Sequence, residues 1–414
     1  MRIARNNYLN KLIARKHNSL VKVITGIRRC GKSYLLFELF KEHLVQTGVQ
    51  PDHIVEIQLD DRANRTLRDP DACYEYVRSH TQGGGEYYVM LDEVQLMPEF
   101  EDVLNGFLHF GNVDVYVTGS NSKFLSTDVI TEFRGRGDEV RVHPLTFAEF
   151  FSTWKGDWES AWNAYYTYGG MPRIAGMDDE AEKIEYLERL FTETYFRDIV
   201  ERNSVNRPEE LEELVDFIAS AIGSLTNPAL LAATFKSAKG VDISEATIGS
   251  YLTYLEDAFL VSRAKRYDVR GRRAIGSPYK YYFEDVGLRN ARLKFRQQEP
   301  AHIMENVIYN ELRLRGYAVD VGVIETRTTV DGKSLYKQWE VDFIATDGLR
   351  KFYIQSAYAL PTDEECRQEL APLKKIDDSF RKIVIVAHDI ATYTDANGFI
   401  FMGLFTFLLN DALL

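Results

Sequence analysis

An eight-residue stretch, Gly26-Ile27-Arg28-Arg29-Cys30-Gly31-Lys32-Ser33, restricts the fold of this chain more than any other part of the sequence. The apolar run 21–25 precedes it, and a helical pattern beginning at Tyr34 follows it. Two glycines separated by four residues and followed by lysine and serine, between a strand and a helix, form the pattern of a phosphate-binding loop. Because glycine lets the backbone turn tightly, the amides of such a loop can point at anionic phosphates. We therefore expect residues 26–34 to bind ATP, with Lys32 at the β- and γ-phosphates and Ser33 on Mg²⁺.

A second motif supports this interpretation. Residues 86–91 predict an aromatic and aliphatic strand that ends in Asp92 and Glu93. P-loop enzymes place a carboxylate from a buried strand beside the phosphate loop, so Asp92 is expected to hold Mg²⁺ together with Ser33. Glu93 then lies where a general base could polarise the attacking water. An Asp-Glu pair after a strand can also be a solvated turn, but the loop upstream favours the catalytic interpretation.

The composition places few further limits on the chain. It has 414 residues, of which 45% are hydrophobic and 27% charged, which is enough for two or three cores. A formal charge of −12 argues against a general nucleic-acid coat, although a local basic face can still bind phosphates. The three cysteines show neither metal-ligand spacing nor a disulfide framework. The longest apolar run, 399–409, is too short to cross a bilayer, so we expect a cytoplasmic protein without membrane partners.

Strands and helices alternate in the first third of the chain. Further strands are expected at 54–59, 113–117 and 139–143, and helices at 5–16 and 69–80. This alternation predicts an α/β fold with a parallel sheet and right-handed crossovers. We assign residues 1–155 to a P-loop ATPase domain.

Two loops of this domain carry further candidate residues. Ser120 and Asn121 follow the strand 113–117 at the carboxyl edge of the sheet, where either could contact the γ-phosphate or the attacking water. The alternative is a helix N-cap, a common position for both residue types. Arg136, with Arg134 as second choice, is a candidate arginine finger acting on a neighbouring subunit, which would imply a homo-oligomer. The alternative for both arginines is surface charge.

Together these motifs resemble a known family. The segments 21–33, Leu91-Asp92-Glu93-Val94-Gln95, 117–122, Gly135-Arg136 and 144–150 are similar to those of bacterial and archaeal AAA-type ATPases with a C-terminal domain of unknown function, DUF4143. The resemblance covers essentially the whole chain, including Tyr168-Gly169-Gly170-Met171-Pro172 and 195–202. It implies an AAA-like domain whose five strands lie in the order 5-1-4-3-2.

The middle of the chain predicts a connector and a winged helix. Residues 156–205 read as a helical lid or connector whose aromatic residues are expected to pack in the core. Within 206–297, helices at 211–222, from 227 and at 244–257 precede a two-stranded ribbon of 261–266 and 280–284, as in a helix-turn-helix with a wing. Residues 261–300 hold 11 Lys or Arg and 4 Asp or Glu, so the local balance is +7. The candidate contacts to duplex DNA are Arg263, Lys265, Arg266, Arg270, Arg272, Arg273 and Lys280.

Another interpretation of this region remains open. Winged helices also contact proteins, and the expected recognition helix 244–257 carries Glu245, Glu256 and Asp257 but no Lys or Arg. A protein partner is therefore the alternative to DNA.

The last segment, 298–414, is expected to form a small nuclease-like α/β domain. We expect a helix at 305–315 and strands near 317–324, 336–345, 351–357 and 382–387, and the segments 340–344 and 352–357 resemble the PD-(D/E)XK nuclease core. Glu305 and Asp342 match acids of that core, but Gln355 stands at its second acid position and Ala357 at its lysine position. An amide binds Mg²⁺ more weakly than a carboxylate, and alanine supplies no cation. We therefore expect a nuclease-like fold retained for binding, although an active nuclease remains a third option.

The sequence thus predicts a Mg-ATP-hydrolysing AAA-type ATPase that couples turnover to movement of a DNA-binding C-terminal module. The alternative is a nucleotide-dependent switch or scaffold whose C-terminal half binds proteins.

Overall fold

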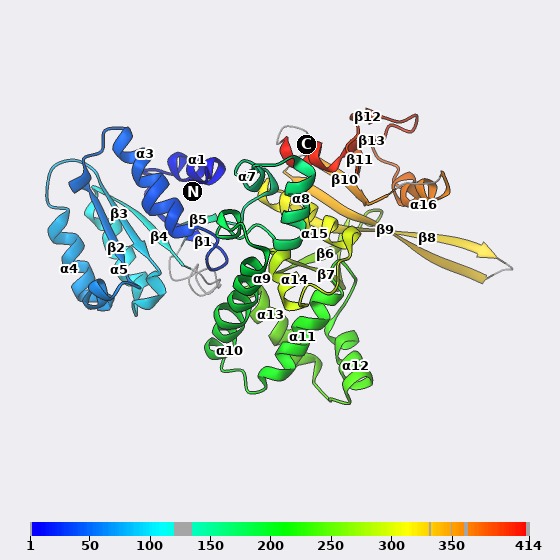
Figure 1. Ribbon diagram of the computed structural model, residues 1–414, viewed down its shortest axis with the longest axis horizontal. Coiled ribbons are helices and arrows are strands. Elements are labelled where there is room, and N and C mark those ends of the chain that lie inside the picture. Colours follow the sequence, from blue (N-terminus) through cyan, green and yellow to red (C-terminus); the bar gives the residue numbers. More distant parts are fainter. Residues whose placement is uncertain (1, 120–134, 331–332, 349, 360–362, 411–414) are drawn as a thin grey trace. The chain divides into compact units, whose positions relative to one another are not determined.

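The computed structural model describes residues 2–119, 135–330, 333–348, 350–359 and 363–410 (Figure 1). The chain divides into two compact units. The first consists of residues 1–145 and 257–259, and the second of residues 146–256 and 260–414.

The first unit contains a parallel five-stranded sheet in the order β2-β3-β4-β1-β5. Its strands are β1 (Val21–Thr25), β2 (Ile54–Gln58), β3 (Tyr87–Asp92), β4 (Val113–Thr118) and β5 (Gly137–Arg141). Every residue of β1 and β3 is buried, which agrees with their mostly apolar sequences. The expected order 5-1-4-3-2 and the α/β fold class are confirmed.

The helices of this unit are α1 (Asn6–Ala14), α2 (Lys32–Tyr34), η1 (Leu35–Phe40), α3 (Lys41–Gln46), η2 (Pro51–His53), η3 (Arg62–Arg68), α4 (Pro70–His80), η4 (Val94–Leu96), α5 (Phe100–Phe107) and η5 (Leu108–Phe110). The segments α2, η1 and α3 follow one another without a break, so one helical stretch runs from Lys32 to Gln46. Its middle part, η1, is π-helical. Asp69 caps α4 by accepting a hydrogen bond from the Ala72 amide, and Pro70 occupies the first turn.

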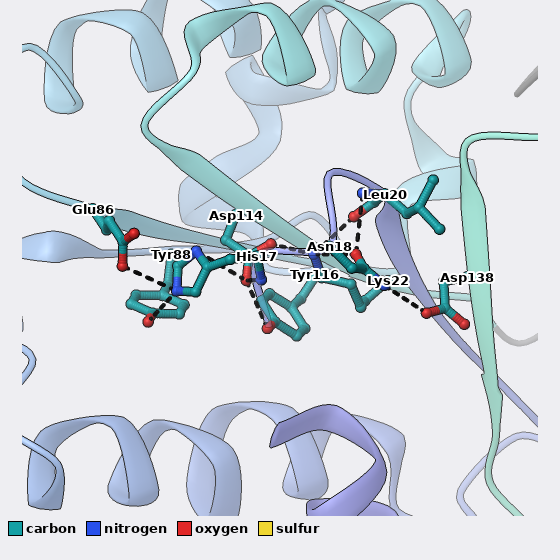
Figure 2. Close-up of polar contacts among 9 residues, drawn as sticks. All are labelled: His17, Asn18, Leu20, Lys22, Glu86, Tyr88, Asp114, Tyr116 and Asp138. Atoms are coloured by element: carbon teal, nitrogen blue, oxygen red, sulfur yellow. Dashed lines mark hydrogen bonds and ion pairs between the residues drawn. The ribbon is translucent and has the colours of Figure 1, made fainter. Parts of the chain in front are cut away.

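A buried polar network fixes the amino edge of this sheet (Figure 2). The ammonium of Lys22, fully buried in β1, donates to the Asp114 carboxylate of β4 and to the Leu20 carbonyl at 2.7 Å. The Tyr116 hydroxyl and the His17 amide also donate to Asp114, at 2.8 and 3.1 Å. The segment before β1 is therefore tied to β4 at the edge opposite to the glycine-rich loop.

The second unit begins with a helical region. Its helices are α7 (Phe147–Phe151), α8 (Trp158–Tyr168), η7 (Ile174–Gly176), α9 (Glu180–Arg189), η8 (Leu190–Phe196), α10 (Arg197–Arg202), α11 (Pro208–Ser220), α12 (Pro228–Lys239), α13 (Glu245–Asp257) and α14 (Val286–Arg292). Aromatic residues of α7 and α8 pack together, with Phe147 at 5.7 Å from Trp162 and 5.6 Å from Tyr165 between ring centroids. The aromatic residues of this region thus serve the core.

The Tyr168-Gly169-Gly170 turn packs against the start of α14. The Asp285 carboxylate accepts hydrogen bonds from the amides of Gly170 and Leu288, at 2.7 and 3.0 Å. A Cβ atom on Gly287 would lie 2.0 Å from the Tyr168 carbonyl oxygen, so only glycine allows this approach. The glycine motif therefore serves contact between distant segments.

An eight-stranded sheet completes the second unit, in the order β12-β13-β11-β10-β9-β8-β6-β7. Its strands are β6 (Val261–Asp268), β7 (Arg273–Phe283), β8 (Ala318–Val330), β9 (Lys333–Asp347), β10 (Arg350–Ala357), β11 (Arg381–Val386), β12 (Tyr393–Thr394) and β13 (Ile400–Gly403), and its helices are α15 (Pro300–Leu314), α16 (Asp363–Lys374) and α17 (Leu404–Leu409). In Figure 1 the β8–β9 hairpin extends beyond the other strands of this sheet.

The ribbon expected as a wing does form, because β6 and β7 pair antiparallel. It is not separate from the nuclease-like part, however. β6 also pairs in parallel with β8 from Arg266↔Val321 to Asp268↔Val323. One sheet therefore runs across the domain boundary expected at residues 297–298.

Candidate functional site

The glycine-rich loop adopts a conformation that requires glycine at its two ends. Gly26 and Gly31 have φ values of +138° and +101°, in a region that other residues rarely adopt. A Cβ atom on Gly26 would lie 2.0 Å from the Val142 carbonyl oxygen. The loop therefore packs directly on the backbone that follows β5, and its fold explains both glycines of the motif.

Arg5 holds this loop from outside the motif. The guanidinium, only 3% exposed, donates to the carbonyl oxygens of Cys30 at 3.2 Å and His143 at 2.6 Å. The Cys30 thiol also donates to the Val142 carbonyl oxygen at 3.3 Å. The segment before α1 and the segment after β5 thus brace the loop from two sides.

Lys32 lies under the loop, not in solvent. Its buried ammonium donates to the carbonyl oxygens of Gly26 at 3.0 Å and Ile27 at 3.1 Å. Around it, Ser33 and Tyr34 are half-buried, Arg28 is half-buried and Arg29 is exposed. The loop carbonyls thus hold the Lys32 cation against the loop, and its role at the β- and γ-phosphates stays a prediction.

Ser33 and Asp92 meet at the carboxyl edge of the sheet. The two side chains are hydrogen-bonded to each other, although β1 and β3 are separated by β4. Burial raises the pKa of the Asp92 carboxyl, and the hydrogen bonds from Thr118 and Ser33 oppose that shift. A hydroxyl and a carboxylate side by side are hard oxygen donors, so this pair fits Mg²⁺. The sequence predicted these two residues as the metal ligands, and that role stays a prediction.

Glu93 leaves the strand in a left-handed conformation, with φ +51°. Gln95 donates its side-chain amide to the Glu93 carboxylate. The Glu93 amide donates to the Thr118 hydroxyl oxygen at 3.0 Å, and the same hydroxyl donates to Asp92. Non-glycine residues in this backbone region are strained, and such residues are often found at functional sites. The backbone conformation of Glu93 therefore agrees with the catalytic role expected for it.

Sequence reasoning missed Thr118. It lies at the end of β4, fully buried between the strands that carry the loop and the acids. The signal for Thr118 is a polar residue at the end of an apolar strand, two residues before Ser120 and three before Asn121. Ser120, Asn121 and Arg134 lie outside the described residues.

Arg136 lies far from the loop of its own chain. Its carbonyl oxygen accepts a hydrogen bond from the Val21 amide at 2.8 Å, and its side chain is exposed. Val21 begins β1, whereas the glycine-rich loop follows the end of β1. Arg136 is therefore at the amino edge of the sheet, and as a finger it would have to act on another subunit.

Burial divides the seven candidate DNA contacts. Arg263, Lys265, Arg270, Arg272 and Arg273 are exposed. Arg266 and Lys280 are 8% and 4% exposed, respectively, which corrects their assignment to a DNA-contacting surface. Strand alternation explains the difference, because Arg263 and Lys265 face solvent while Ala264 and Arg266 face the interior.

Internal ion pairs also reduce the basic excess of residues 261–300. Arg289 is fully buried, so it offers no charge to a partner, although its pair with Glu299 at 2.9 Å is already counted in the balance. Arg292 pairs with Asp216 at 2.5 Å and Glu212 at 2.8 Å. The counted balance of +7 therefore overstates the charge available to a partner.

The nuclease-like residues converge, but with an unexpected neighbour. Glu305 of α15 and Asp342 of β9 approach the same ammonium, that of Lys280 from β7. Ala357 is 2% exposed and belongs to an apolar core with Val341 and Leu373. Sequence reasoning did not foresee a lysine from the ribbon at this place.

Family models match two parts of the chain. Residues 18–151 match the model of an AAA domain, and residues 159–299 match a domain of unknown function, DUF8612. The second match stands where the resemblance implied DUF4143, which is not among the matches found. Together with the loop and sheet described above, the first match defines an AAA-type P-loop ATPase domain.

Relatives extend the likeness to the whole chain. An uncharacterized protein of Haemophilus influenzae is 32% identical over 92% of this chain and 93% of its own length, and the chain belongs to the same family as that protein. An uncharacterized protein of Methanocaldococcus jannaschii is 28% identical over 93% of this chain and 84% of its own length.

Among solved structures, the Aeropyrum pernix ORC1 protein in complex with DNA is similar, with 13% identity and a TM-score of 0.33 over 70% of this chain and 92% of that one. Caenorhabditis elegans PCH-2 is 15% identical, with a TM-score of 0.27 over 61% and 65% of the two chains. In the part of the chain that the structure describes, no helix has both the length and the apolar character of a membrane span.

Proposed function

We propose that this protein binds Mg-ATP at the loop 26–34 and hydrolyses it, and that turnover is coupled to movement of a DNA-binding C-terminal unit. One observation carries the hydrolysis: the Asp92 carboxylate interacts with Ser33, which follows the glycine-rich loop, and Thr118 links Asp92 to the Glu93 amide at the same edge of the sheet. An AAA domain over residues 18–151 supports the same conclusion.

The roles of the chain's own residues follow from this arrangement. The loop amides and Lys32 bind the phosphates, and Ser33 and Asp92 would hold the metal. When bound, Mg²⁺ neutralises charge on the β- and γ-phosphate oxygens. Glu93 orients and polarises the attacking water, since its carboxylate is half-buried and fixed by Gln95.

The test is steady-state ATP hydrolysis by the full chain. Glu93→Gln is expected to bind nucleotide without turnover, and Lys32→Ala to lose binding as well. Lys41→Ala is the matched control, because Lys41 is an exposed lysine of the same helical stretch, paired with Glu56. Turnover by Glu93→Gln at the wild-type rate would overturn the proposal.

DNA binding is proposed through the exposed arginines and lysines of the ribbon. Phosphate contacts make affinity fall steeply with salt, so duplex binding by the full chain should weaken between 50 and 200 mM salt by about tenfold for every two contacts. Arg270→Ala/Arg272→Ala should weaken binding and flatten this dependence. Lys41→Ala/Arg78→Ala removes the same number of exposed charges from the first unit and should not.

A protein-binding switch is the second candidate, and α13 favours it. This helix has no Lys or Arg, and Glu256 near its end pairs with Arg263 at 3.2 Å. It also borders a polar cavity of about 630 Å³ whose lining includes Arg207, Tyr251 and Tyr254. Such a cavity suits a side chain or short peptide better than a duplex. Absence of duplex binding at low salt, with ATP turnover intact, would support this candidate.

A further inference from the structure

Lys280 occupies the centre of the nuclease-like part of the second unit. It lies in β7 opposite Ala264 of β6, and its side chain is 5% exposed. The ammonium is 2.9 Å from Glu305 Oε1, 2.8 Å from Glu340 Oε1 and 3.9 Å from Asp342 Oδ1. Three carboxylates from α15 and β9 thus surround a single buried cation.

Neighbouring donors fix two of these carboxylates. The Tyr282 hydroxyl donates to Glu305 Oε1 at 2.5 Å, and the Ser356 amide donates to Asp342 Oδ2 at 2.8 Å. Tyr282 is fully buried and stacks on Tyr309 with centroids 4.2 Å apart, and the Asp342 side chain is 13% exposed. The positions of the Glu305 and Asp342 carboxylates therefore do not depend on Lys280 alone.

The positions that would complete a nuclease metal site are used otherwise. Gln355 donates its amide nitrogen to Glu369 at 3.1 Å, and its oxygen is buried with no hydrogen-bond partner. Among the residues that the structure describes, no three His, Cys, Asp or Glu side chains are placed to hold a metal ion together. With Lys280 among the acids, a divalent ion and the ammonium would compete for the same oxygens. The residues present therefore do not fit the nuclease metal.

We propose that Lys280 is the resident cation of this centre: its ammonium takes the place between Glu305 and Asp342 that a divalent metal takes in a nuclease, and it locks the ribbon to α15 and β9. The centre is then independent of metal in the native protein. Removal of the lysine side chain would leave its carboxylates without a cation and free to rearrange around a divalent ion.

Lys280 supplies both a positive charge and a side chain that fills the centre. Burying carboxylates without a cation is costly, so each must be paired, protonated or bound to a metal. Lys280→Ala removes both the positive charge and the chain that fills the centre. The remaining carboxylate oxygens are hard ligands suited to Mn²⁺ or to the lanthanide Tb³⁺.

The experiment measures terbium luminescence of the full chain without nucleotide, excited through tyrosine. Tyr282 touches Glu305 and is placed to sensitise an ion bound there. Lys280→Ala should gain a saturable signal with at least tenfold higher affinity than any signal of the wild type, and Lys280→Ala/Asp342→Asn should lose it. Lys382→Ala is the matched control, since Lys382 is a largely buried lysine of the same sheet that donates to the Asp378 carbonyl oxygen at 2.8 Å.

A second measurement does not depend on the folding of Lys280→Ala. Ligands that bind only the folded state raise its unfolding midpoint. Millimolar Mn²⁺ should therefore leave the midpoint of the wild-type second unit unchanged within about 1 °C. A rise in this midpoint that Asp342→Asn abolishes would overturn the proposal, and so would a folded Lys280→Ala variant that gains no terbium signal.

Discussion

Thr118 donates its hydroxyl to the Asp92 carboxylate and, through the same oxygen, accepts a hydrogen bond from the Glu93 amide at 3.0 Å. One side chain of β4 thus contacts both the Asp92 carboxylate and the Glu93 backbone at the end of β3. We regard Thr118 as a positioning residue, because it reaches the reaction through Asp92 and Glu93.

Thr118→Val should impair turnover more than nucleotide binding. Valine keeps the shape of threonine but neither donates nor accepts, so the acids lose their orientation. Loss of such an outer hydrogen bond typically costs about 10- to 100-fold in activity. ATPase kinetics and nucleotide binding check this, with Thr234→Val as control, since the Thr234 hydroxyl only bonds within α12. Equal turnover by Thr118→Val and wild type would remove Thr118 from the site.

Arg136→Ala should reduce turnover only in an assembly, because Arg136 lies at the sheet edge opposite its own loop. An arginine finger contributes a factor of about a thousand or more. Mixing Arg136→Ala with Glu93→Gln should restore part of the lost activity, since one variant supplies the finger and the other the base. No recovery on mixing, or full activity of Arg136→Ala alone, would show that this arginine is ordinary surface charge.

Asp114→Asn should destabilise the first unit strongly. The substitution removes the charge that compensates the fully buried Lys22 ammonium. Burial lowers the pKa of the Lys22 ammonium, and its interaction with the Asp114 carboxylate raises it. Without that carboxylate, the buried ammonium loses the interaction that favours its charged form. Breaking a buried pair costs about 3 to 5 kcal/mol of unfolding free energy.

Denaturant unfolding of the amino-terminal unit measures this loss. Lys22→Met/Asp114→Asn, which removes both charges, should recover part of the stability that Asp114→Asn loses. If the two residues act independently, the losses of unfolding free energy caused by Lys22→Met and Asp114→Asn should add in the double variant. Such additivity would contradict the assignment of a buried pair.

The second unit should lose stability as pH rises from about 4 to about 6. Burial raises the pKa of Asp285 to about 6, while its three backbone hydrogen bonds oppose that shift. The folded state therefore holds a proton that the unfolded state has released. The contribution is fully present below the unfolded pKa and is lost as pH rises through the folded one, by about 3 kcal/mol at most.

Asp285→Asn isolates this contribution, because asparagine does not titrate. The difference in unfolding free energy between wild type and variant should decline between these pH values and then stay constant. A difference that is flat from pH 4 to pH 7 would contradict the assignment to Asp285.

The sequence predicted the nucleotide domain well because its signals are local. Apolar runs gave the five strands to within about two residues at their ends, and the loop motif placed Lys32 and Ser33. The strand order came from the resemblance, not from the residues. Thr118 escaped because a threonine at a strand end has many ordinary roles.

The C-terminal half was less predictable because its key contacts join distant segments. The β6–β7 hairpin could be predicted because its two strands are neighbours in the sequence. The three-residue pairing of β6 with β8 has no recognisable pattern in the sequence of either strand. The sequence predicted Lys280 to be a surface cation, because lysine is rarely buried without charged partners. Its partners Glu305, Glu340 and Asp342 lie far along the chain, and no local sequence pattern predicts that they converge on Lys280.

The pairing of β6 with β8 also limits how this protein can be cut into pieces. A fragment ending near residue 297 would keep the ribbon but lose β8, and so expose the backbone donors and acceptors of β6 along one side. Unpaired strand edges invite association with other chains. Such a fragment should aggregate on expression, so laboratory truncation and gene fusion are better placed near residue 145, where the continuous part of the first compact unit ends.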